Sequence, residues 1–389
     1  MLAAQLRLPR ADGTLAPYVA SDAPRHPIAP QPPPRTRVVF AAAHVVADPR
    51  SPVDPVLGGA VDWEATLAYR RHLWSLGFAV ADAMDTAQRG SGLMPADARE
   101  LIRRSAAEAR AAGGTVAFGA ATDELDQTQT YDLAAIERAY LAQCELIEGE
   151  GCAAIVMCSR ALPRAATSAD DYARVYRTVL GALRRPAILH WLGPMFDPLL
   201  RGYWGSDDLD RATETFVAIV RENAAKVDGV KISLLDAGRE IALRRVLPPH
   251  VRVYTGDDFN YPELIAGDGE RHSDALLGIF DAIAPAARAA LTALDEGDRA
   301  RYDAILAPTV TLSRHLFAAP TYAYKTGVVF LAYLNGFQGH FRMLGGAESA
   351  RSVVHLARAL ELADAAGLIL DRERAAERAA RVFATAGIV

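Results

Sequence analysis

Short apolar runs alternating with longer amphipathic stretches are the feature that most limits how this chain can fold. Eight runs rich in valine, isoleucine and alanine lie at residues 37–43, 78–84, 115–120, 153–158, 187–192, 229–234, 251–255 and 275–280. Helical patterns separate most of these runs, at residues 62–76, 96–112, 132–149, 168–184 and 208–226. Strands that are apolar throughout are typical of a parallel sheet whose outer face is covered by helices. Eight such units predict a closed (β/α)8 barrel of the α/β class.

An open, doubly wound sheet is the alternative architecture. Such folds often carry a Gly-x-Gly-x-x-Gly turn after the first strand, and no such turn follows residues 37–43. The closed barrel is therefore the favoured interpretation.

Two regions flank the predicted barrel, which we place at residues 37–290. Residues 1–36 end in Gln31-Pro32-Pro33-Pro34, and this proline-rich composition predicts an irregular N-terminal arm. Residues 291–389 are expected to form a C-terminal helical region. Helical patterns at the end of the chain lie at residues 286–306, 310–318, 323–340 and 349–386. We expect the helix at 168–184 to begin with Ser168 as its N-cap.

Composition excludes several classes of protein. The net charge of −5 does not favour nucleic acid or an anionic membrane surface as a partner. No apolar run of about 20 residues predicts a membrane span, and no signal-peptide pattern opens the chain. Cys144, Cys152 and Cys158 match neither a disulfide framework nor a zinc pattern. We therefore expect a cytoplasmic protein with reduced thiols.

Lysine is unusually rare in this chain. Of its 42 lysine and arginine residues, lysine accounts for three, which are Lys226, Lys231 and Lys325. Lys231 lies inside the predicted strand at residues 229–234. A buried lysine has a lowered pKa, and its neutral amine can attack a carbonyl to form a Schiff base. Arginine cannot do this, so the scarcity of lysine favours a reactive amine over a side chain that merely reaches water at the strand end.

Other polar residues follow the strands at the end of the barrel where active sites lie. His190, in the strand before Lys231, is a candidate for acid–base work, although it could equally be a core histidine. Gly256, Asp257 and Asp258 follow the next strand, where they would face a ligand or form an ordinary polar loop.

Residues near the first two strands allow a weaker hypothesis. His44, Asp82 and Asp85 could belong to a metal site, but the ordinary polarity of loops explains them as well. We therefore predict no metal and no other cofactor.

The order and spacing of these motifs resemble the dihydrodipicolinate synthase and N-acetylneuraminate lyase family of class I aldolases, over residues 37 to 370. The matching stretches are Ala60-Val61-Asp62-Trp63-Glu64 with a helix ending at Gly77, Gly229-Val230-Lys231, Gly256-Asp257-Asp258, Lys325, Asn335-Gly336 and Phe341-Arg342-Met343. The resemblance implies a barrel with C-terminal helices, often a homodimer or homotetramer. It also implies that Lys231 forms an imine with pyruvate or another 2-oxo acid, and that Gly256 and Asp258 contact the substrate.

The chain departs from the family at three places. His190 stands where the family has a tyrosine proton relay. Met84-Asp85-Thr86-Ala87-Gln88 replaces the Gly-Thr-Thr-Gly-Glu loop that grips the substrate carboxylate, so Thr86 and Gln88 are the candidates there. The arginine that some members carry after the relay tyrosine is absent. Arg160 or Arg201 is the candidate to replace it.

Together these patterns predict a homo-oligomeric lyase or aldolase-like enzyme that forms a Schiff base with a small carbonyl compound, a 2-oxo acid in the first instance. Lys231 and His190 are the predicted catalytic residues. Two alternatives stay open: a barrel that has lost catalysis and binds or senses a small acid, and a metal-dependent enzyme using His44, Asp82 and Asp85.

Overall fold

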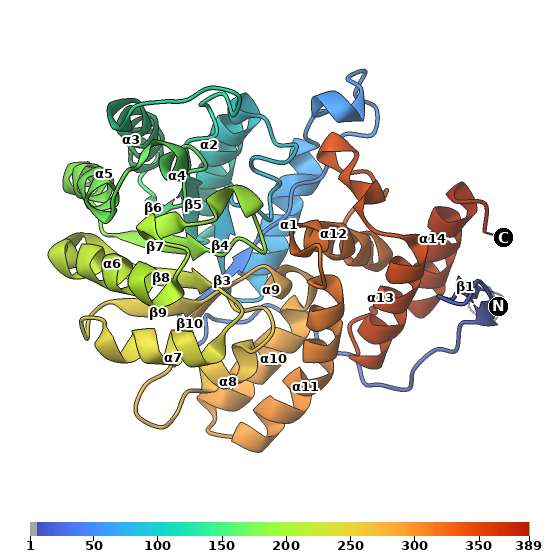
Figure 1. Ribbon diagram of the computed structural model, residues 1–389. Helices are drawn as coiled ribbons and strands as arrows, with labels where there is room; N and C mark the ends of the chain where they lie inside the picture. Colours follow the sequence, from blue (N-terminus) through green and yellow to red (C-terminus); the bar gives the residue numbers. More distant parts are fainter. Residues whose placement is uncertain (1–5, 389) are drawn as a thin grey trace.

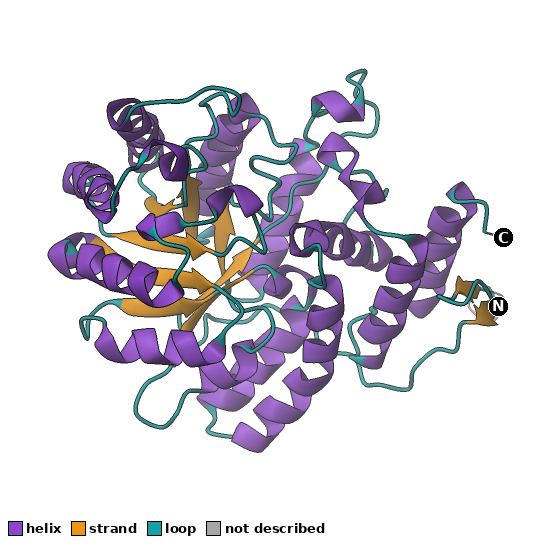
Figure 2. Ribbon diagram, viewed as in Figure 1, coloured by secondary structure: helices purple, strands orange, loops and turns teal. Residues whose placement is uncertain are grey.

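Eight parallel strands close into a barrel in the computed structural model, which describes residues 6–388 (Figures 1 and 2). The strands are hydrogen-bonded in the order β10-β3-β4-β5-β6-β7-β8-β9, and β10 closes the ring by pairing with both β9 and β3. They are β3 (Val39–Ala42), β4 (Ala79–Asp82), β5 (Val116–Ala120), β6 (Ala153–Val156), β7 (Ala187–Leu192), β8 (Val227–Ser233), β9 (Arg252–Thr255) and β10 (Asp274–Leu277). Each overlaps one of the eight apolar runs, so the predicted (β/α)8 barrel is confirmed.

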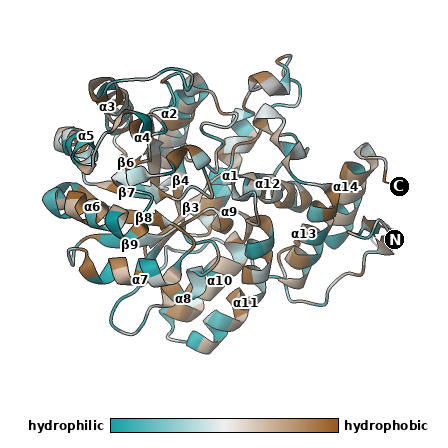
Figure 3. Ribbon diagram, viewed as in Figure 1, coloured by the Kyte–Doolittle hydropathy of each residue, from teal (hydrophilic) through white to brown (hydrophobic). Residues whose placement is uncertain are grey.

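Helices surround the barrel and connect its strands (Figure 2). The helices of this ring are α1 (Trp63–Ser75), α2 (Pro95–Ala112), α3 (Leu133–Gly149), α4 (Leu162–Ala165), α5 (Ala169–Ala182), α6 (Leu209–Glu222), α7 (Ala237–Val246) and α8 (Tyr261–Ala266). Figure 3 shows that they carry both hydrophilic and hydrophobic residues, as expected for helices with one face on a sheet. Asp62 and Asp132 cap α1 and α3 by accepting backbone N–H groups. Ser168 holds the N-cap position of α5, but its side chain makes no capping bond.

Further helices follow the last strand and lie beside the barrel in Figure 1. They are α9 (Ile279–Ala282), α10 (Ala284–Asp295), α11 (Arg299–Leu316), α12 (Tyr324–Asn335), α13 (Val353–Ala365) and α14 (Arg372–Thr385). The single helices predicted at 286–306 and 349–386 are wrong in extent. Gly297 and Gly367 adopt positive φ angles of 79° and 69°, which end one helix and allow the next to begin.

The N-terminal arm contains a feature that its composition did not predict. β1 (Arg7–Pro9) and β2 (Leu15–Pro17) pair as a two-stranded antiparallel sheet beside α13 and α14 (Figure 1). The prediction of a wholly irregular arm is therefore wrong. A short turn closes this hairpin, and its buried Leu8 packs into the main core.

Side chains alternate between the inside of the barrel and the layer beneath the helices. Ile188 belongs to the barrel-interior cluster, whereas Leu189 and Trp191 belong to the outer one. Along β8, Val230 and Ile232 likewise face outward. Because successive strand residues point to opposite faces, the side chains between them point into the barrel.

Within residues 6–388 we find no helix that combines the length and the apolar character needed to cross a membrane.

Candidate active site

Lys231 and His190 lie next to each other on the inner face of the barrel. They are register partners on the neighbouring strands β7 and β8. Both alternate with outward-facing residues, so both side chains point inward. Both are buried, with 5% and 1% of their surface exposed. The two predicted catalytic residues are thus brought together by adjacent strands.

The amine of Lys231 lacks the hydrogen-bond and ion-pair partners that a buried charged group normally has. Within the described part of the chain, no residue forms a hydrogen bond or ion pair with its Nζ atom. Burial lowers the pKa of Lys231 below its ordinary value, and the charges of Asp85 and Asp258 only partly oppose that shift. The lowered pKa increases the fraction of neutral amine, which is the form that acts as a nucleophile.

Gly256, at the end of β9, leaves room for the lysine. A Cβ atom added here would lie 2.2 Å from the Ser233 Oγ atom and 2.8 Å from the Lys231 Cε atom. Any larger residue would therefore collide with the side chains of both Ser233 and Lys231. The glycine predicted to allow close approach does so for the lysine itself.

The two aspartates after Gly256 have different settings. Asp258 accepts a hydrogen bond from the Ile279 backbone nitrogen at 2.9 Å, and burial raises its pKa to about 8. Asp257 instead accepts hydrogen bonds from Phe259 and Asn260 within its own turn. Asp258 opposes the lowering of the Lys231 pKa in its ionised form, whereas the oxygens of Asp257 accept hydrogen bonds that shape the loop.

Asp85 connects the two sides of the site. Its Oδ2 atom accepts a hydrogen bond of 2.8 Å from the Tyr324 hydroxyl, while its Oδ1 atom is buried without a hydrogen-bond partner. Burial raises the pKa of this carboxyl, but the nearby amines of Lys231 and Lys325, with smaller contributions from His190 and the Tyr324 hydrogen bond, outweigh burial and lower it overall. Asp85 is therefore an ionised carboxylate with one oxygen that is not hydrogen-bonded.

His190 is neutral in this environment. Burial lowers its pKa well below 6.5, and the nearby charge of Lys231 acts in the same direction. Its Nε2 atom lies 3.1 Å from the Ser233 Oγ atom, and its Nδ1 atom is buried without a partner. Lys231, Asp85 and His190 thus each present a polar atom that forms no hydrogen bond.

The loop after β4 carries Thr86 and Gln88. The Thr86 hydroxyl is 2.7 Å from the Tyr324 hydroxyl, so it supports the tyrosine that holds Asp85. Gln88 exchanges two hydrogen bonds with the Leu344 backbone, at 2.8 and 3.2 Å. Gln88 therefore ties the loop to the C-terminal region. Its φ of 62° is rare for a residue with a side chain.

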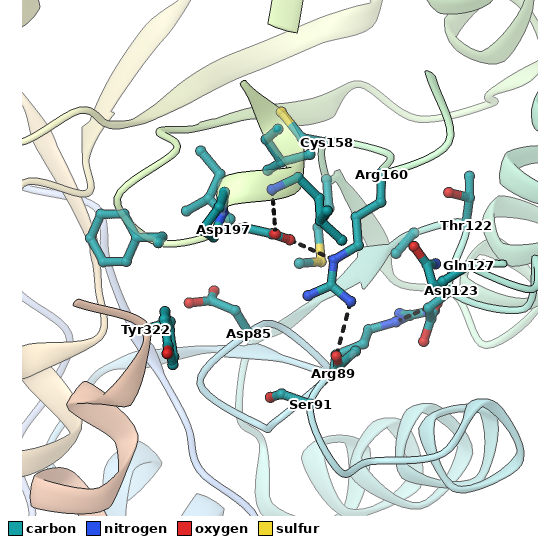
Figure 4. A pocket seen from close by; sticks show the side chains of 18 of the residues that line it. Asp85, Arg89, Ser91, Thr122, Asp123, Gln127, Cys158, Arg160, Asp197 and Tyr322 are labelled. Atoms are coloured by element: carbon teal, nitrogen blue, oxygen red, sulfur yellow. Dashed lines mark hydrogen bonds and ion pairs between the residues drawn. The ribbon is translucent and has the colours of Figure 1, made fainter. Parts of the chain in front are cut away.

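A cavity of about 410 Å³ adjoins this group (Figure 4). The Arg160 side chain lines the cavity, and its Nε atom lies 2.6 Å from the Oδ2 atom of Asp197, an ion pair that Figure 4 marks with a dashed line. Lys231 is not among the lining residues, but Asp85 is, and its charge acts on Lys231. The residues that line the cavity are Asp85, Arg89, Gly90, Ser91, Ala121, Thr122, Asp123, Gln127, Met157, Cys158, Arg160, Leu192, Phe196, Asp197, Pro198, Leu199, Leu200, Tyr322 and Lys325.

Helix α12 supplies two residues that the sequence did not single out for the site. Tyr324 and Lys325 lie in its first turn, and both are buried. The rarity of lysine was the signal that could have identified Lys325, since the same argument had selected Lys231. Tyr324 carries no comparable signal, being one of 13 tyrosines.

The suggested metal ligands have other partners. His44 Nδ1 lies 2.8 Å from an oxygen of Asp281, and Asp82 pairs with Arg70 at 2.8 Å. Across residues 6–388, no three histidine, cysteine or acidic side chains form a group that could hold a metal ion. The interpretation of His44, Asp82 and Asp85 as a metal site is therefore wrong.

Comparisons with known proteins agree with this architecture. The model of DUF993, described as a protein of unknown function, matches residues 6–388. The chain belongs to the DUF993 family. A search of curated proteins finds no match.

Solved structures share the fold of this DUF993 chain at low sequence identity. Dihydrodipicolinate synthase from Aquifex aeolicus has a TM-score of 0.65 and 15% identity, over 86% of this chain and 99% of that one. A putative dihydrodipicolinate synthetase from Pseudomonas aeruginosa has a TM-score of 0.61 and 17% identity, over 84% and 100%. YagE from E. coli K12, a member of the dihydrodipicolinic acid synthase family in complex with pyruvate, has a TM-score of 0.62 and 14% identity, over 90% and 98%. At these identities the likeness establishes the fold.

Proposed function

We propose that this protein is a lyase or aldolase-like enzyme that forms a Schiff base between Lys231 and a small carbonyl compound. The observation that carries the proposal is the buried Lys231 side chain, which points to the inside of the barrel and whose Nζ atom has no hydrogen-bond partner among the described residues. Structural lysines at such depth are normally paired, because an unpaired buried charge is costly. A neutral, nucleophilic amine avoids that cost.

The chemistry begins with attack of the Lys231 nitrogen on the carbonyl carbon. The nitrogen loses a proton and the carbonyl oxygen gains one, which yields a carbinolamine. Protonation of the carbinolamine hydroxyl releases water and leaves a cationic iminium on Lys231. The iminium withdraws electrons from the neighbouring carbon, so that a bond to that carbon can break or form. Water returns the amine and releases the product.

Proton transfer requires a carrier near Lys231, and two residues suit the task. Asp85 is ionised and has its Oδ1 atom without a hydrogen bond, so it can carry the amine proton to the carbonyl oxygen, and a second proton, taken up from water, can pass through it to the leaving hydroxyl. His190 is neutral and can accept a proton at Nδ1. In this proposal Asp85 is the main proton carrier, because an ionised carboxylate also stabilises the iminium cation. Tyr324 acts as a positioning residue that holds Asp85.

Substrate contacts beyond the lysine are assigned within the same proposal. Asp258 lies close enough to Lys231 for its charge to act there. Thr86 supports Tyr324, and Arg160 lines the cavity. The likeness in fold to YagE, which was solved with pyruvate, supports 2-oxo acids as the first compounds to try.

Trapping of the imine tests the proposed function. The protein is incubated with pyruvate and a series of larger 2-oxo acids, reduced with cyanoborohydride and digested for mass spectrometry. We expect a reduced adduct at Lys231 and none after Lys231→Arg. Lys226→Arg is the matched control, because the Lys226 amine donates to a backbone carbonyl outside the barrel mouth.

Absence of any adduct at Lys231 across the whole series would reject the lyase. The alternative of a binding protein without catalysis would then be favoured if a 2-oxo acid raised the melting temperature of the wild type and of Lys231→Met equally.

A further inference from the structure

We propose that Lys325 binds the carboxylate of the substrate, and that the substrate is an aliphatic oxo acid larger than pyruvate whose carbon chain lies in the cavity. This inference rests on the proposed function, because it concerns the compound whose carbonyl reacts with Lys231. It assigns the anionic end of that compound to a residue of helix α12.

Lys325 is built into the wall of the cavity. It lines the cavity but is 8% exposed, so its ammonium group is largely removed from bulk water. Its Nζ atom donates to the Tyr322 carbonyl at 3.1 Å and lies 4.8 Å from the centre of the Tyr324 ring. An ammonium group has three donors, and a single hydrogen bond leaves two of them for a ligand.

The presence of a lysine at position 325 indicates a specific role, because lysine is rare in this chain. The chain uses arginine for 39 of its 42 basic residues, and two of its three lysines lie near Asp85. Lys325 is within range of the charges of Asp85 and of the Arg160–Asp197 pair. A lysine places a compact charge with three donors at this position, whereas an arginine would place a planar guanidinium with a different donor geometry there.

The charges around the cavity would be balanced by one negative charge on the ligand. The charge of Asp85 acts on Lys325, whose ammonium donates to the Tyr322 carbonyl, and Arg160 is paired with Asp197. Burial lowers the pKa values of Lys325 and Lys231 and raises that of Asp258, and Asp85 opposes the shift at both lysines. When Lys231 becomes an iminium, one positive charge is added in a region shielded from water. A single carboxylate on the substrate restores neutrality, whereas a phosphate monoester, with nearly two charges, would exceed it.

Part of the cavity lining is apolar. It comes from β6 and β7 and from the segments that follow them, and its members are Met157, Cys158, Leu192, Phe196, Pro198, Leu199 and Leu200. A cavity of about 410 Å³ is within the usual range for ligand sites, and such a lining suits a hydrocarbon chain. Lys325 and this apolar part together favour a compound with a charged end and an apolar chain.

Four ligands separate the effects of the charge, the chain and the carbonyl. 2-Oxohexanoate carries all three, hexan-2-one lacks the carboxylate, hexanoate lacks the carbonyl, and pyruvate lacks the chain. Adduct formation at Lys231 is measured against the concentration of 2-oxohexanoate, hexan-2-one and pyruvate, and the shift in melting temperature is measured for hexanoate. The proteins are the wild type, Lys325→Met and Lys325→Arg.

We expect Lys325→Met to raise the half-saturating concentration of 2-oxohexanoate by about 10- to 100-fold, the range for a charged hydrogen bond. That of hexan-2-one should change less than about 3-fold, and Lys325→Arg should recover part of the loss. Equal losses for both ketones, or no loss for either, would overturn the assignment of the carboxylate to Lys325. If adduct formation had a lower half-saturating concentration for pyruvate than for 2-oxohexanoate, the inference that the substrate is larger than pyruvate would be wrong.

Hexanoate distinguishes this inference from the proposed function. Stabilisation of the wild type but not of Lys325→Met supports the carboxylate site even if no ketone reacts with Lys231, in which case only the lyase is rejected. If hexanoate stabilised the wild type and Lys325→Met equally, Lys325 would not be the carboxylate-binding residue. If Lys325→Met fails to fold, Lys325→Gln replaces it in every measurement.

Discussion

The side chain of Lys231 occupies space that is open because Gly256, beside it, has no side chain. Replacing Gly256 with alanine would place a methyl group 2.8 Å from the lysine Cε atom and 2.2 Å from the Ser233 Oγ atom, which forces one of them to move. We expect Gly256→Ala to reduce the rate of adduct formation at least about 10-fold and to lower the free energy of unfolding by about 1–3 kcal/mol. Trapping kinetics and urea denaturation measure the two effects.

Gly238→Ala provides the control for this substitution. Its Cβ atom would meet only the Asp236 Oδ1 atom, at 3.5 Å, which is an ordinary contact. It should leave both measurements nearly unchanged. A Gly256→Ala protein that reacts as fast as the wild type would show that the lysine does not need this space.

The charge of Asp85 sets how adduct formation responds to pH. The pKa of Lys231 is lowered by burial, so in the wild type the rate should rise with pH and level off below pH 10.5. Asp85 acts against this shift by stabilising the ammonium form. In Asp85→Asn the pKa of Lys231 should fall further, and the rise should move to lower pH.

The same substitution removes the proposed proton carrier. The plateau rate of Asp85→Asn should therefore fall by roughly 100-fold, the size of a typical acid–base contribution. Asp123→Asn is the control, because Asp123 lines the cavity but pairs with Arg89. A rise that moves to higher pH, or an unchanged plateau, would contradict the role given to Asp85.

At the scale of elements, the site is formed where the loop after β4 meets the start of α12. Tyr324 makes this junction by bonding both Asp85 and Thr86, and its ring is stacked on Phe317 with centroids 4.3 Å apart. Gln88 makes a second connection to the Leu344 backbone. Helix α12 is thus part of the site as well as of the C-terminal helical region.

Removal of the Tyr324 hydroxyl tests this junction. We expect Tyr324→Phe to fold, since the ring stacking is kept, and to lower the rate of adduct formation about 10-fold because Asp85 loses its donor. As a positioning effect, it should change the rate more than the half-saturating concentration of 2-oxohexanoate. Tyr333→Phe, on the same helix, is the control. Wild-type kinetics in Tyr324→Phe would remove the tyrosine from the proposed mechanism.

At the scale of the whole molecule, the N-terminal arm is fastened to the last helices. Asp364 is buried and accepts hydrogen bonds from the Tyr18 hydroxyl at 2.6 Å and the Ser21 backbone at 2.7 Å. Its other oxygen pairs with Arg372 at 2.7 Å. One carboxylate therefore joins the two ends of the chain.

Loss of this carboxylate should destabilise the protein. We expect Asp364→Ala to lower the free energy of unfolding by about 3–5 kcal/mol, because three donors lose a buried acceptor. Urea denaturation measures the effect, and Glu214→Ala at the surface of α6 is the control. A change below about 1 kcal/mol would show that the arm contributes little to stability.

Assembly into a homo-oligomer remains a prediction. Sedimentation velocity of the full chain at micromolar concentration distinguishes a monomer from a dimer or tetramer.

The sequence by itself determined the barrel, because each buried parallel strand requires its own apolar run and eight such runs are legible along the chain. It also singled out Lys231, since a rare lysine inside an apolar strand is informative without neighbours. It could not predict the hairpin at Arg7–Pro9, or where glycines divide the last helices, because short strands and turns carry weak patterns.

Only the tertiary structure decided which residues surround the lysine. Asp85 and Tyr324 are 239 positions apart, and no local pattern relates a loop after β4 to the first turn of α12. Their contact depends on how the C-terminal helices pack against the barrel, which is a property of the complete fold. The same packing places Lys325 in the cavity wall. The candidate lysine was therefore evident from the sequence, whereas its chemical environment was not.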